Sequence, residues 1–287
     1  SRGKEKLEGK PDLSKGSYYN NPQYDKPVED EELIKQYPSF VGNNIWPSVE
    51  DAPNFESSFK TMGQLIVHVG TLIAAQCDTY IASQCPTYEK NKLKRILDTS
   101  LCCKARLLHY YPKNEEKGAE GEDEALPGED ENFSSWCGWH NDHGSLTGLT
   151  CAMYIDNEGV EQQNTDPQAG LYIRGRKGQL VKASFPEDYL AYQIGETAQV
   201  HTGGLLQATP HAVRGSNVPG VARDTYAVFM EPNWDEKMTV PEGMDPEKAQ
   251  VREVIKTLPP GVPPLHSRWN ETQDFGKFSD ATIAAFY

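Results

Sequence analysis

The sequence predicts a mainly β fold, an antiparallel sandwich or barrel, with flanking helices. Short apolar runs bounded by Gly, Pro, Asn and Asp follow one another from Leu101 to about residue 235, which is typical of strands joined by tight turns. Helical periodicity is confined to the segments before residue 101 and after residue 235. Because strands and helices do not alternate along the chain, a parallel sheet of βαβ units is not expected.

Residues 1–100 are predicted to form an N-terminal arm followed by two helices. The first 50 residues are polar and without a clear period, so we expect an extended arm that wraps around the core. From Asp51 onward, apolar residues recur at spacings of three and four, as on the buried stripe of an amphipathic helix. The residues of that stripe are Phe55, Phe59, Met62, Ile66, Val69 and Ile73. A second helix is expected over 87–99, and we assign both helices to packing.

Residues 101–235 contain the strand candidates of the core. The first is CCKARLLHYYP, which ends at Pro112. The later ones are WCGWHNDHGSLTGLTCAMYI, GLYIRGRKGQLVKAS, DYLAYQIGE, GGLLQATPHAVRG and RDTYAVFMEPN. Helical character returns in 236–287, over 245–258 and again near 279–287, and the stiff segment LPPGVPPL separates the two stretches. The simplest organisation is one catalytic domain over 1–287, with the arm and helices in 1–100, the β core in 101–235 and a helical segment in 236–287.

The charge of the chain restricts its partners. Its 287 residues include 42 acidic and 28 basic ones, a net charge of −14, which disfavours nucleic acid and anionic membranes and favours a small-molecule partner. Nine acids and one lysine lie in 115–131, within an acidic insertion predicted at 113–132. Its composition cannot support a core, so we interpret it as a surface insertion, with a partner-binding loop as the alternative. The rest of the chain has a net charge of only −6, which does not exclude an anionic or zwitterionic substrate.

The cysteines indicate a reducing compartment. Six of them are scattered along the chain without a CxxC pair or a repeated spacing. Such usage is typical of reduced intracellular thiols and not of a disulfide framework. We therefore expect a cytoplasmic protein, and we expect it to be a monomer.

The chemistry is predicted to centre on two histidines and one aspartate. His140 and Asp142 read His-x-Asp in a strand-like run, and side chains two apart on a strand point to the same face. His211 stands 71 residues after His140 in another strand-like segment. Two histidines and one carboxylate form the facial triad of non-haem Fe(II) oxygenases, which leaves three coordination positions open. The alternative is a set of surface residues with incidental spacing.

An arginine and a threonine follow the triad in the segment RDTYAVFM. Arg223 and Thr225 share one face of this predicted strand. A guanidinium fork beside a hydroxyl is suited to bind a carboxylate, whereas the alternative is a strand arginine in an ordinary salt bridge. The ordered set of His-x-Asp, distal His and Arg-x-Thr is more specific than any of its parts, and it predicts a metal site beside an anion site.

With these motifs, the sequence resembles the Fe(II)/2-oxoglutarate-dependent dioxygenases, specifically the branch of isopenicillin N synthase. WHNDHGSLTGLT is similar to the family's W-H-x-D-x-S-L-x-T-x-L strand, and GLYIRGRKGQLVKAS to its G-L-Q-V…G-x-W-x-x-V hairpin. QIGETAQVHTGGLLQATPHAV resembles the stretch that ends in S-x-x-H-R-V. HYYP resembles N-Y-Y-P, whose tyrosine next to the proline, here Tyr111, helps to hold the co-substrate, and the neighbouring Tyr110 is the alternative. The likeness covers 101–235 and, more loosely, the tail QDFGKF.

The resemblance implies a double-stranded β-helix (jelly roll) in which His140, Asp142 and His211 hold Fe(II). It also implies that 2-oxoglutarate chelates the metal, that its far carboxylate meets Arg223 and Thr225, and that O₂ is consumed. The implied reaction is hydroxylation, desaturation or oxidative cyclisation of a small molecule through a ferryl intermediate, with release of succinate and CO₂. The likeness to the ring-forming branch, and to kainoid-forming oxygenases, favours ring closure of an amino-acid-derived substrate.

The chain departs from the family pattern at three positions. Thr225 replaces the commoner serine of Arg-x-Ser, Ala212 stands where an arginine follows the histidine, and His109 stands where asparagine is frequent. Relatives that have lost the use of 2-oxoglutarate exist, isopenicillin N synthase among them. Two alternatives therefore stay open: an iron oxidase that does not depend on 2-oxoglutarate, and a non-catalytic β-helix protein that binds a partner.

Four further residues are candidates for contact with the substrate or for support of the triad. Arg106 would meet a substrate carboxylate if its side chain pointed inward, and Trp234, just past the last strand, would cap the pocket. His109 and His143 lie beside the co-substrate and triad motifs and are candidates for contact with the substrate or for support of the triad, with a surface position as the alternative for His143.

Overall fold

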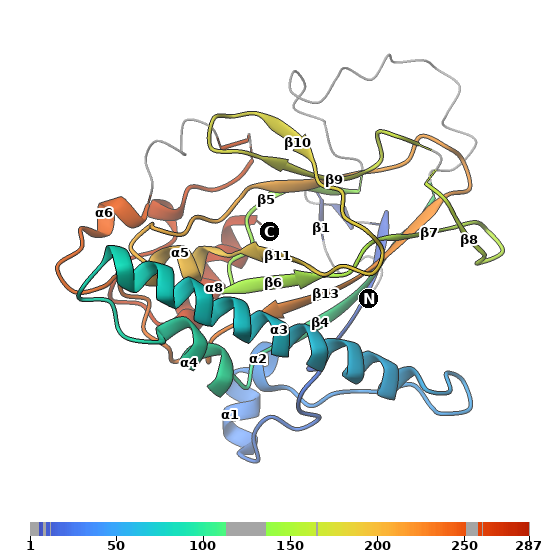
Figure 1. The fold of residues 1–287 in the computed structure, drawn as a ribbon. Coiled ribbons are helices and arrows are strands. Elements are labelled where there is room, and N and C mark those ends of the chain that lie inside the picture. The colour runs from blue at the N-terminus through green and yellow to red at the C-terminus, as the bar shows by residue number, and fades with distance from the viewer. Residues whose placement is uncertain are drawn as a thin grey trace.

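The computed structural model of the protein describes residues 6–7, 10–11, 13–112, 136–164, 166–250, 258–259 and 261–286. Within them, two antiparallel sheets face each other and helices lie outside (Figure 1). The larger sheet has the strand order β11-β6-β13-β4-β3, with β7 paired to β13 and β8 to β7, and the smaller has the order β10-β9-β12-β5. The mainly β fold with flanking helices that the sequence predicts is confirmed.

The strands and helices have the following bounds. The larger sheet consists of β3 (Lys15–Asn20), β4 (Lys104–Tyr110), β6 (Leu146–Leu149), β7 (Met153–Ile155), β8 (Glu161–Gln162), β11 (Ala191–Ile194) and β13 (Ala222–Met230). The smaller sheet consists of β5 (Cys137–His140), β9 (Gly170–Arg174), β10 (Leu180–Lys182) and β12 (His211–Arg214). A separate pair is formed by β1 (Lys6–Leu7) and β2 (Lys10–Pro11). The helices are α1 (Glu31–Gln36), α2 (Pro38–Val41), α3 (Phe55–Gln84), α4 (Lys92–Thr99), α5 (Glu196–His201), α6 (Pro246–Ala249), the 3₁₀ turn η2 (Leu265–Ser267) and α8 (Phe275–Phe286).

Helix α3 covers the outer face of the larger sheet (Figure 1). Phe59 and Ile66 are buried there as predicted, but Met62 is 38% exposed. The buried stripe runs instead through Gly63 and Gly70, because the helix lies too close to the sheet for larger side chains: a Cβ at Gly70 would lie 2.5 Å from the sulfur of Met230. Tertiary packing thus shifts the predicted stripe.

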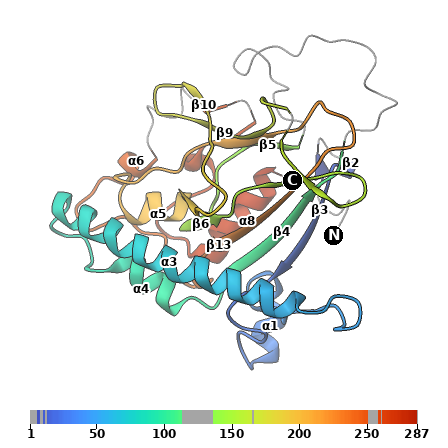
Figure 2. The ribbon, with the colours of Figure 1, turned by 45° about the vertical axis from the view of Figure 1, so that its right-hand side comes forward.

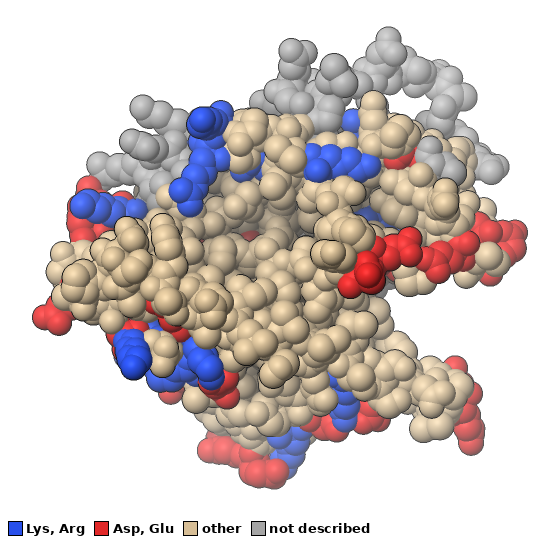
Figure 3. All heavy atoms as spheres, viewed as in Figure 1, with Lys and Arg blue, Asp and Glu red and all other residues tan. Residues whose placement is uncertain are grey.

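The outer side of α3 is unusually free of charge. Between Thr61 and Gln84 the only acidic or basic side chain besides His68 is Asp78, which is buried, and Figure 3 shows a largely uncharged surface over the helix. Large apolar side chains exposed on it include Leu65 and Leu72. Length and hydropathy of α3 would suffice to cross a membrane, yet its inner side is packed on the sheet as in the core helix of a globular protein.

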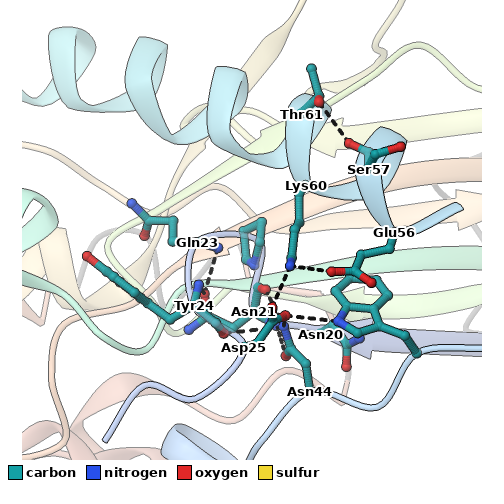
Figure 4. A network of polar contacts seen from close by, with 12 residues as sticks. Asn20, Asn21, Gln23, Tyr24, Asp25, Asn44, Glu56, Ser57, Lys60 and Thr61 are labelled. Carbon is teal, nitrogen blue, oxygen red and sulfur yellow. Dashed lines mark hydrogen bonds and ion pairs between the residues drawn. The ribbon is translucent and has the colours of Figure 1, made fainter. Parts of the chain in front are cut away.

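The N-terminal arm becomes part of the larger sheet. Strand β3 pairs with β4 from Lys15↔Tyr110 to Asn20↔Ala105, so the two strands lie side by side (Figure 2). The next segment is held to α3 by Asp25, which accepts a hydrogen bond from Lys60 of that helix (Figure 4). Asp25 also accepts one from the indole of Trp46. The arm therefore wraps onto the core, as the sequence predicts.

Several predicted features lie outside the described residues. The acidic insertion at 113–132 is one, and most of the helix expected over 245–258 is another; its described part forms α6. The helices expected near 87–99 and 279–287 correspond to α4 and α8. The organisation of the chain as one catalytic domain stays a prediction.

Candidate functional site

A cavity of about 1160 Å³ lies between the two sheets. Successive residues of a strand point to opposite faces, and in β4 and β13 it is the even-numbered and odd-numbered residues, respectively, that line the cavity. From β4 these include Arg106 and Tyr110, and from β13 they include Arg223 and Thr225. The alternate residues, such as Tyr226, pack toward α3. The larger sheet thus has one face for packing and one for the cavity.

The structure brings the three predicted metal ligands together at this cavity. His140 ends β5, His211 begins β12, and the two are partners in the antiparallel register. Asp142 follows β5 by two residues, and its Oδ1 lies 3.8 Å from Nε2 of His140 and 3.7 Å from Nε2 of His211. The three ligand atoms lie within 4.8 Å of one another. Strand pairing therefore places both imidazoles, and the loop after β5 supplies the carboxylate.

Backbone carbonyls hold both imidazoles from behind. Nδ1 of His140 donates to the carbonyl of Gly138 at 2.8 Å, and Nδ1 of His211 donates to that of Thr209 at 3.1 Å. A proton on Nδ1 leaves the lone pair of Nε2 aimed at the centre of the cluster, which is the tautomer of a metal-ligating histidine. Asp142 Oδ2 is buried and has no hydrogen-bond partner among the described residues. The two fixed imidazoles and the carboxylate with an oxygen to spare fit a divalent cation.

Burial and mutual charge set the protonation of the cluster. Burial alone would lower the pKa of His140, but the Cys137 thiolate and Asp142 raise it to about 9. Burial and the charge of His140 lower the pKa of His211 to about 4, against the pull of Asp142. Burial opposes ionisation of Asp142, yet the two histidines hold its pKa below the usual value. A bound cation would therefore find an ionised carboxylate and a neutral His211, and would displace one proton from His140.

The predicted carboxylate clamp lies at the start of β13. Arg223 is 6% exposed, and its Nη1 donates to the hydroxyl of Thr225 at 3.5 Å, a long contact. Its guanidinium lies 5.6 Å from the ring centroid of Tyr110, the residue opposite it on β4. Nε of Arg223 is buried without a hydrogen-bond partner in the described structure. A buried guanidinium with donors to spare is suited to a carboxylate.

Tyr154 is a neighbour of the clamp that the sequence does not single out. It stands opposite Arg223 on β7 and lines the cavity. Burial raises the pKa of its hydroxyl, although Arg223 acts against this shift by its charge and by a hydrogen bond. No motif marks this tyrosine, because only the pairing of β7 with β13 brings it to Arg223.

The tyrosine assignment at the end of β4 needs a correction. The resemblance gives Tyr111 a part in holding the co-substrate, but it is Tyr110 that lines the cavity beside Arg223. The ring of Tyr111 instead contacts that of His109 at 4.5 Å, and its hydroxyl lies over Gly16 of β3. The physical reason is the alternation of the strand, since adjacent residues of β4 cannot both face the cavity.

Of the remaining candidates, only Arg106 lines the cavity. Its guanidinium donates to the hydroxyl of Ser17 at 2.8 Å and lies over the ring of Tyr19. His109 pairs with Asp224 at 2.7 Å and is not among the cavity residues. Arg106 therefore stays a candidate for substrate contact, whereas His109 belongs to the opposite face of the sheet.

His143 and Trp234 lie away from the cavity. The indole of Trp234 stacks on Tyr37, with ring centroids 5.5 Å apart, so the expectation that it caps the pocket is wrong. Directly after β13 the chain turns toward an apolar cluster that includes Phe40, Met238 and Phe275, and Trp234 packs against this cluster. His143 contacts the C-terminal helix α8, with Nε2 at 3.1 Å from the hydroxyl of Ser279. A role of His143 in support of the triad stays a prediction.

No protein-family model matches the chain, and no curated protein sequence does. Solved structures do match. A putative 2OG-Fe(II) oxygenase family protein from Caulobacter crescentus is similar with a TM-score of 0.62 and 19% identity, over 100% of this chain and 74% of its own.

Two further matches were solved with ligands. A full-length Neurospora crassa protein in complex with alpha-KG has a TM-score of 0.59 and 18% identity over 96% of this chain, which spans 66% of the length of that protein. JOX2 in complex with 2OG, Fe and JA has a TM-score of 0.52 and 15% identity, over 83% of this chain and 56% of its own. The chain therefore has the fold of the 2OG-Fe(II) oxygenases, and the predicted double-stranded β-helix is confirmed.

Proposed function

We propose that this chain is an Fe(II)- and 2-oxoglutarate-dependent oxygenase that oxidises a small molecule. The observation that carries the proposal is one cavity that holds both the His-Asp-His cluster and Arg223, a buried guanidinium with an unpaired Nε. The cluster alone would fit many metal ions, and the arginine alone would fit many anions. Together they suit a keto acid that chelates a metal at one end and carries a carboxylate at the other.

The metal would be held by His140, Asp142 and His211. Two neutral imidazoles and one carboxylate suit Fe(II) and leave coordination positions for the keto acid and O₂. When bound, iron and 2-oxoglutarate supply a two-electron oxidation by O₂ in which the co-substrate leaves as succinate and CO₂. The carbonyls behind the histidines fix the direction in which their Nε2 atoms point before any ligand arrives.

The far carboxylate of 2-oxoglutarate would be bound by Arg223 with help from Thr225. Tyr110 and Tyr154 flank the same guanidinium and close the site on two sides. Because the site is buried, the hydrogen bonds from these side chains to the carboxylate would be stronger than in water. These four side chains come from three paired strands, so the binding geometry is set by the sheet and not by a loop.

The other task of the chain is to orient the substrate and to exclude water. Apolar side chains from both sheets line the cavity: Leu108, Leu149, Leu171, Val213 and Phe229. They would hold a substrate C–H bond near the metal and keep bulk water away from it. The volume of the cavity supports a small-molecule substrate. Two proteins of the same fold were solved with small molecules, the Neurospora crassa protein with thymine and JOX2 with JA.

The type of oxidation is a finer part of the proposal. Hydroxylation adds one oxygen atom to the substrate, whereas desaturation and ring closure remove two hydrogens, so product masses separate the two outcomes. Ring closure of an amino-acid-derived substrate rests on the sequence resemblance to the isopenicillin N synthase branch alone. A cytoplasmic location and a monomeric state belong to the same proposal, and the described cysteines, all free thiols, support the location.

The test measures succinate formed from 2-oxoglutarate in the presence of Fe(II), O₂ and a panel of small molecules. Wild-type protein should form succinate only with Fe(II), and His140→Ala and Asp142→Ala should abolish it. Asp98→Ala, which removes an exposed carboxylate on α4, is the matched control and should be as active as the wild type. Unchanged turnover in both triad variants would refute the proposal. O₂ consumption that needs Fe(II) but not 2-oxoglutarate would favour an iron oxidase instead.

A further inference from the structure

The loop that carries Asp142 is held by a polar network that no motif describes. Asn141 stands between the two ligands His140 and Asp142, and its Nδ2 donates to Oε1 of Glu196 at 3.0 Å. Glu196 begins α5 and is 2% exposed. Its backbone N–H donates in turn to the carbonyl of Asp142 at 2.8 Å. Both the side chain and the backbone of one residue therefore contact the metal loop.

Glu196 is itself fixed by an arginine from the C-terminal segment. Arg268 donates to Oε1 of Glu196 at 2.7 Å and to Oε2 at 2.9 Å, a bidentate pair in which both side chains are 2% exposed. The guanidinium also donates to Thr282 of α8 at 2.8 Å and to the carbonyl of Pro263 at 3.0 Å. These further bonds fix the guanidinium, and through it Glu196, to the C-terminal segment.

The same two elements contact the rest of the loop. The hydroxyl of Thr197 donates to the carbonyl of His143 at 2.6 Å, and Ser279 of α8 lies 3.1 Å from the imidazole of His143. Gly195 approaches the loop so closely that a Cβ there would lie 2.0 Å from the carbonyl oxygen of Gly144. Helices α5 and α8 therefore both contact the loop, and none of these residues lines the cavity.

A buried ion pair is weak evidence for stability, because removing two charges from water offsets most of their attraction. Such a pair is better explained where it fixes a geometry that an apolar contact would leave loose. Here the ion pair fixes the loop that joins His140 to Asp142. Groups that hold metal ligands from behind commonly set metal affinity.

We propose that Arg268, Glu196 and Asn141 form a positioning network that keeps Asp142 in the geometry for metal binding. The inference rests on the proposed function, since it assumes that the triad binds a metal. It gives the C-terminal segment a role in the site: Pro263 and Thr282 hold Arg268, Arg268 holds Glu196, and Glu196 holds the loop. None of the three residues is expected to touch the metal, the co-substrate or the substrate.

The experiment titrates Co(II) into the metal-free protein and follows its d–d absorption. Asn141→Ala removes the hydrogen bond from Asn141 to Glu196 but leaves the Glu196–Arg268 pair intact. Because Asn141 is only half-buried, the variant should fold. Its affinity for Co(II) should fall by about 10-fold to 100-fold, and the shape of its absorption spectrum should change because the position of Asp142 is relaxed. The thermal unfolding of the metal-free variant should stay close to that of the wild type.

A second variant and a matched control separate positioning from stability. Glu196→Gln should weaken Co(II) binding at least as much as Asn141→Ala, since Arg268 then lacks its charge partner. Asp78→Asn makes the same change at another carboxylate that is 2% exposed; it binds Tyr88 and the backbone of α4, away from the metal loop. This control should lose stability but keep the affinity and the spectrum of the wild type.

The outcomes are distinguishable. Wild-type affinity and spectrum in Asn141→Ala and Glu196→Gln would overturn the inference while leaving the proposed function intact. Equal loss of affinity in Asp78→Asn would also overturn it, because general destabilisation would then explain the effect. A wild-type protein that binds neither Co(II) nor Fe(II) would refute the proposed function, and the inference with it.

Discussion

The two faces of the larger sheet come from the same strands but differ in function: one packs against α3 and the other lines the cavity. On β13, Tyr226, Val228 and Met230 pack toward α3, while Arg223 and Thr225 in the same strand line the cavity. Where α3 covers it, the helix side is apolar, and Tyr226, Val228 and Met230 are at most 7% exposed. The cavity side carries guanidiniums, hydroxyls and amides. A period of two along each strand is enough to separate structure from chemistry.

The faces differ most in how their polar groups are satisfied. On the helix side, the hydroxyl of Tyr226 donates to the carbonyl of Phe59 at 2.6 Å, and that of Tyr192 to the carbonyl of Ile66 at 2.8 Å. On the cavity side, Nε of Arg223 is buried without a partner in the described part of the chain. An unsatisfied buried group costs about 1–3 kcal/mol. At Arg223 this cost falls on the face where a bound carboxylate can offset it.

The largest expected effect on stability lies on the helix side. Ile66→Ala empties a site that is fully buried between α3 and the sheet, so the free energy of unfolding should fall by about 2–5 kcal/mol. Urea denaturation measures it. Leu65→Ala on the same helix, at a residue 48% exposed, is the control and should change it by less than about 0.5 kcal/mol. The affinity of folded Ile66→Ala for Co(II) should equal that of the wild type, and a loss there would break the separation of the two faces.

The next effect concerns the cavity side. Arg223→Lys keeps the charge but loses the guanidinium fork, so the affinity for 2-oxoglutarate should fall by about 10-fold to 100-fold, the value of one charged hydrogen bond. Calorimetric titration of the Co(II)-loaded protein measures it. Arg106→Lys changes the other cavity arginine, which Ser17 and Tyr19 hold, and should leave this affinity unchanged. Equal losses in both variants would mean that Arg223 is not the specific clamp.

A smaller effect tests the hydroxyls that join the sheet to α3. Tyr226→Phe removes one hydrogen bond to Phe59 and should lower the free energy of unfolding by about 0.5–1.5 kcal/mol. Burial raises the pKa of Tyr226 above its usual value of 10.0 and that of Tyr192 to about 12. Because these values are raised in the folded state, the contribution of the hydroxyls is complete below pH 10 and is lost as the pH rises through the folded values.

Stability measured from about pH 9 to about pH 12 checks this sign. The wild type should lose stability above about pH 10, and the double variant Tyr192→Phe/Tyr226→Phe should lose less over the same range. An equal slope in both proteins would show that these two tyrosines are not the groups responsible.

Features that follow from a local pattern could be predicted from the sequence, whereas features that depend on distant contacts could not. The triad is predictable because His-x-Asp is a local pattern whose geometry follows from one strand, and His211 lies opposite His140 in the register. The buried stripe of α3 is predictable only in part, because Gly63 and Gly70 let the helix approach the sheet more closely than a stripe of large residues would.

Other features depend on contacts that leave no local pattern. Glu196 and Arg268 form a bidentate pair across 72 residues, and neither position has a neighbour that would mark it. The position of Trp234 directly after β13 does not reveal where the chain turns next, so its packing on Tyr37 could not be predicted. Register is the hardest case, since a slip of one residue exchanges the two faces of a strand.

The register of β4 gives the smallest and sharpest prediction. Tyr110 and Tyr111 are adjacent and chemically identical, but only Tyr110 lines the cavity beside Arg223. Tyr110→Phe should weaken the binding of 2-oxoglutarate by several-fold, within the roughly 1 kcal/mol of one neutral hydrogen bond. Tyr111→Phe, whose ring contacts His109, should bind it as the wild type does, and calorimetric titration of both Co(II)-loaded variants measures the difference. The opposite result would mean that β4 is shifted by one residue, with Tyr111 at the clamp as the sequence motif indicates.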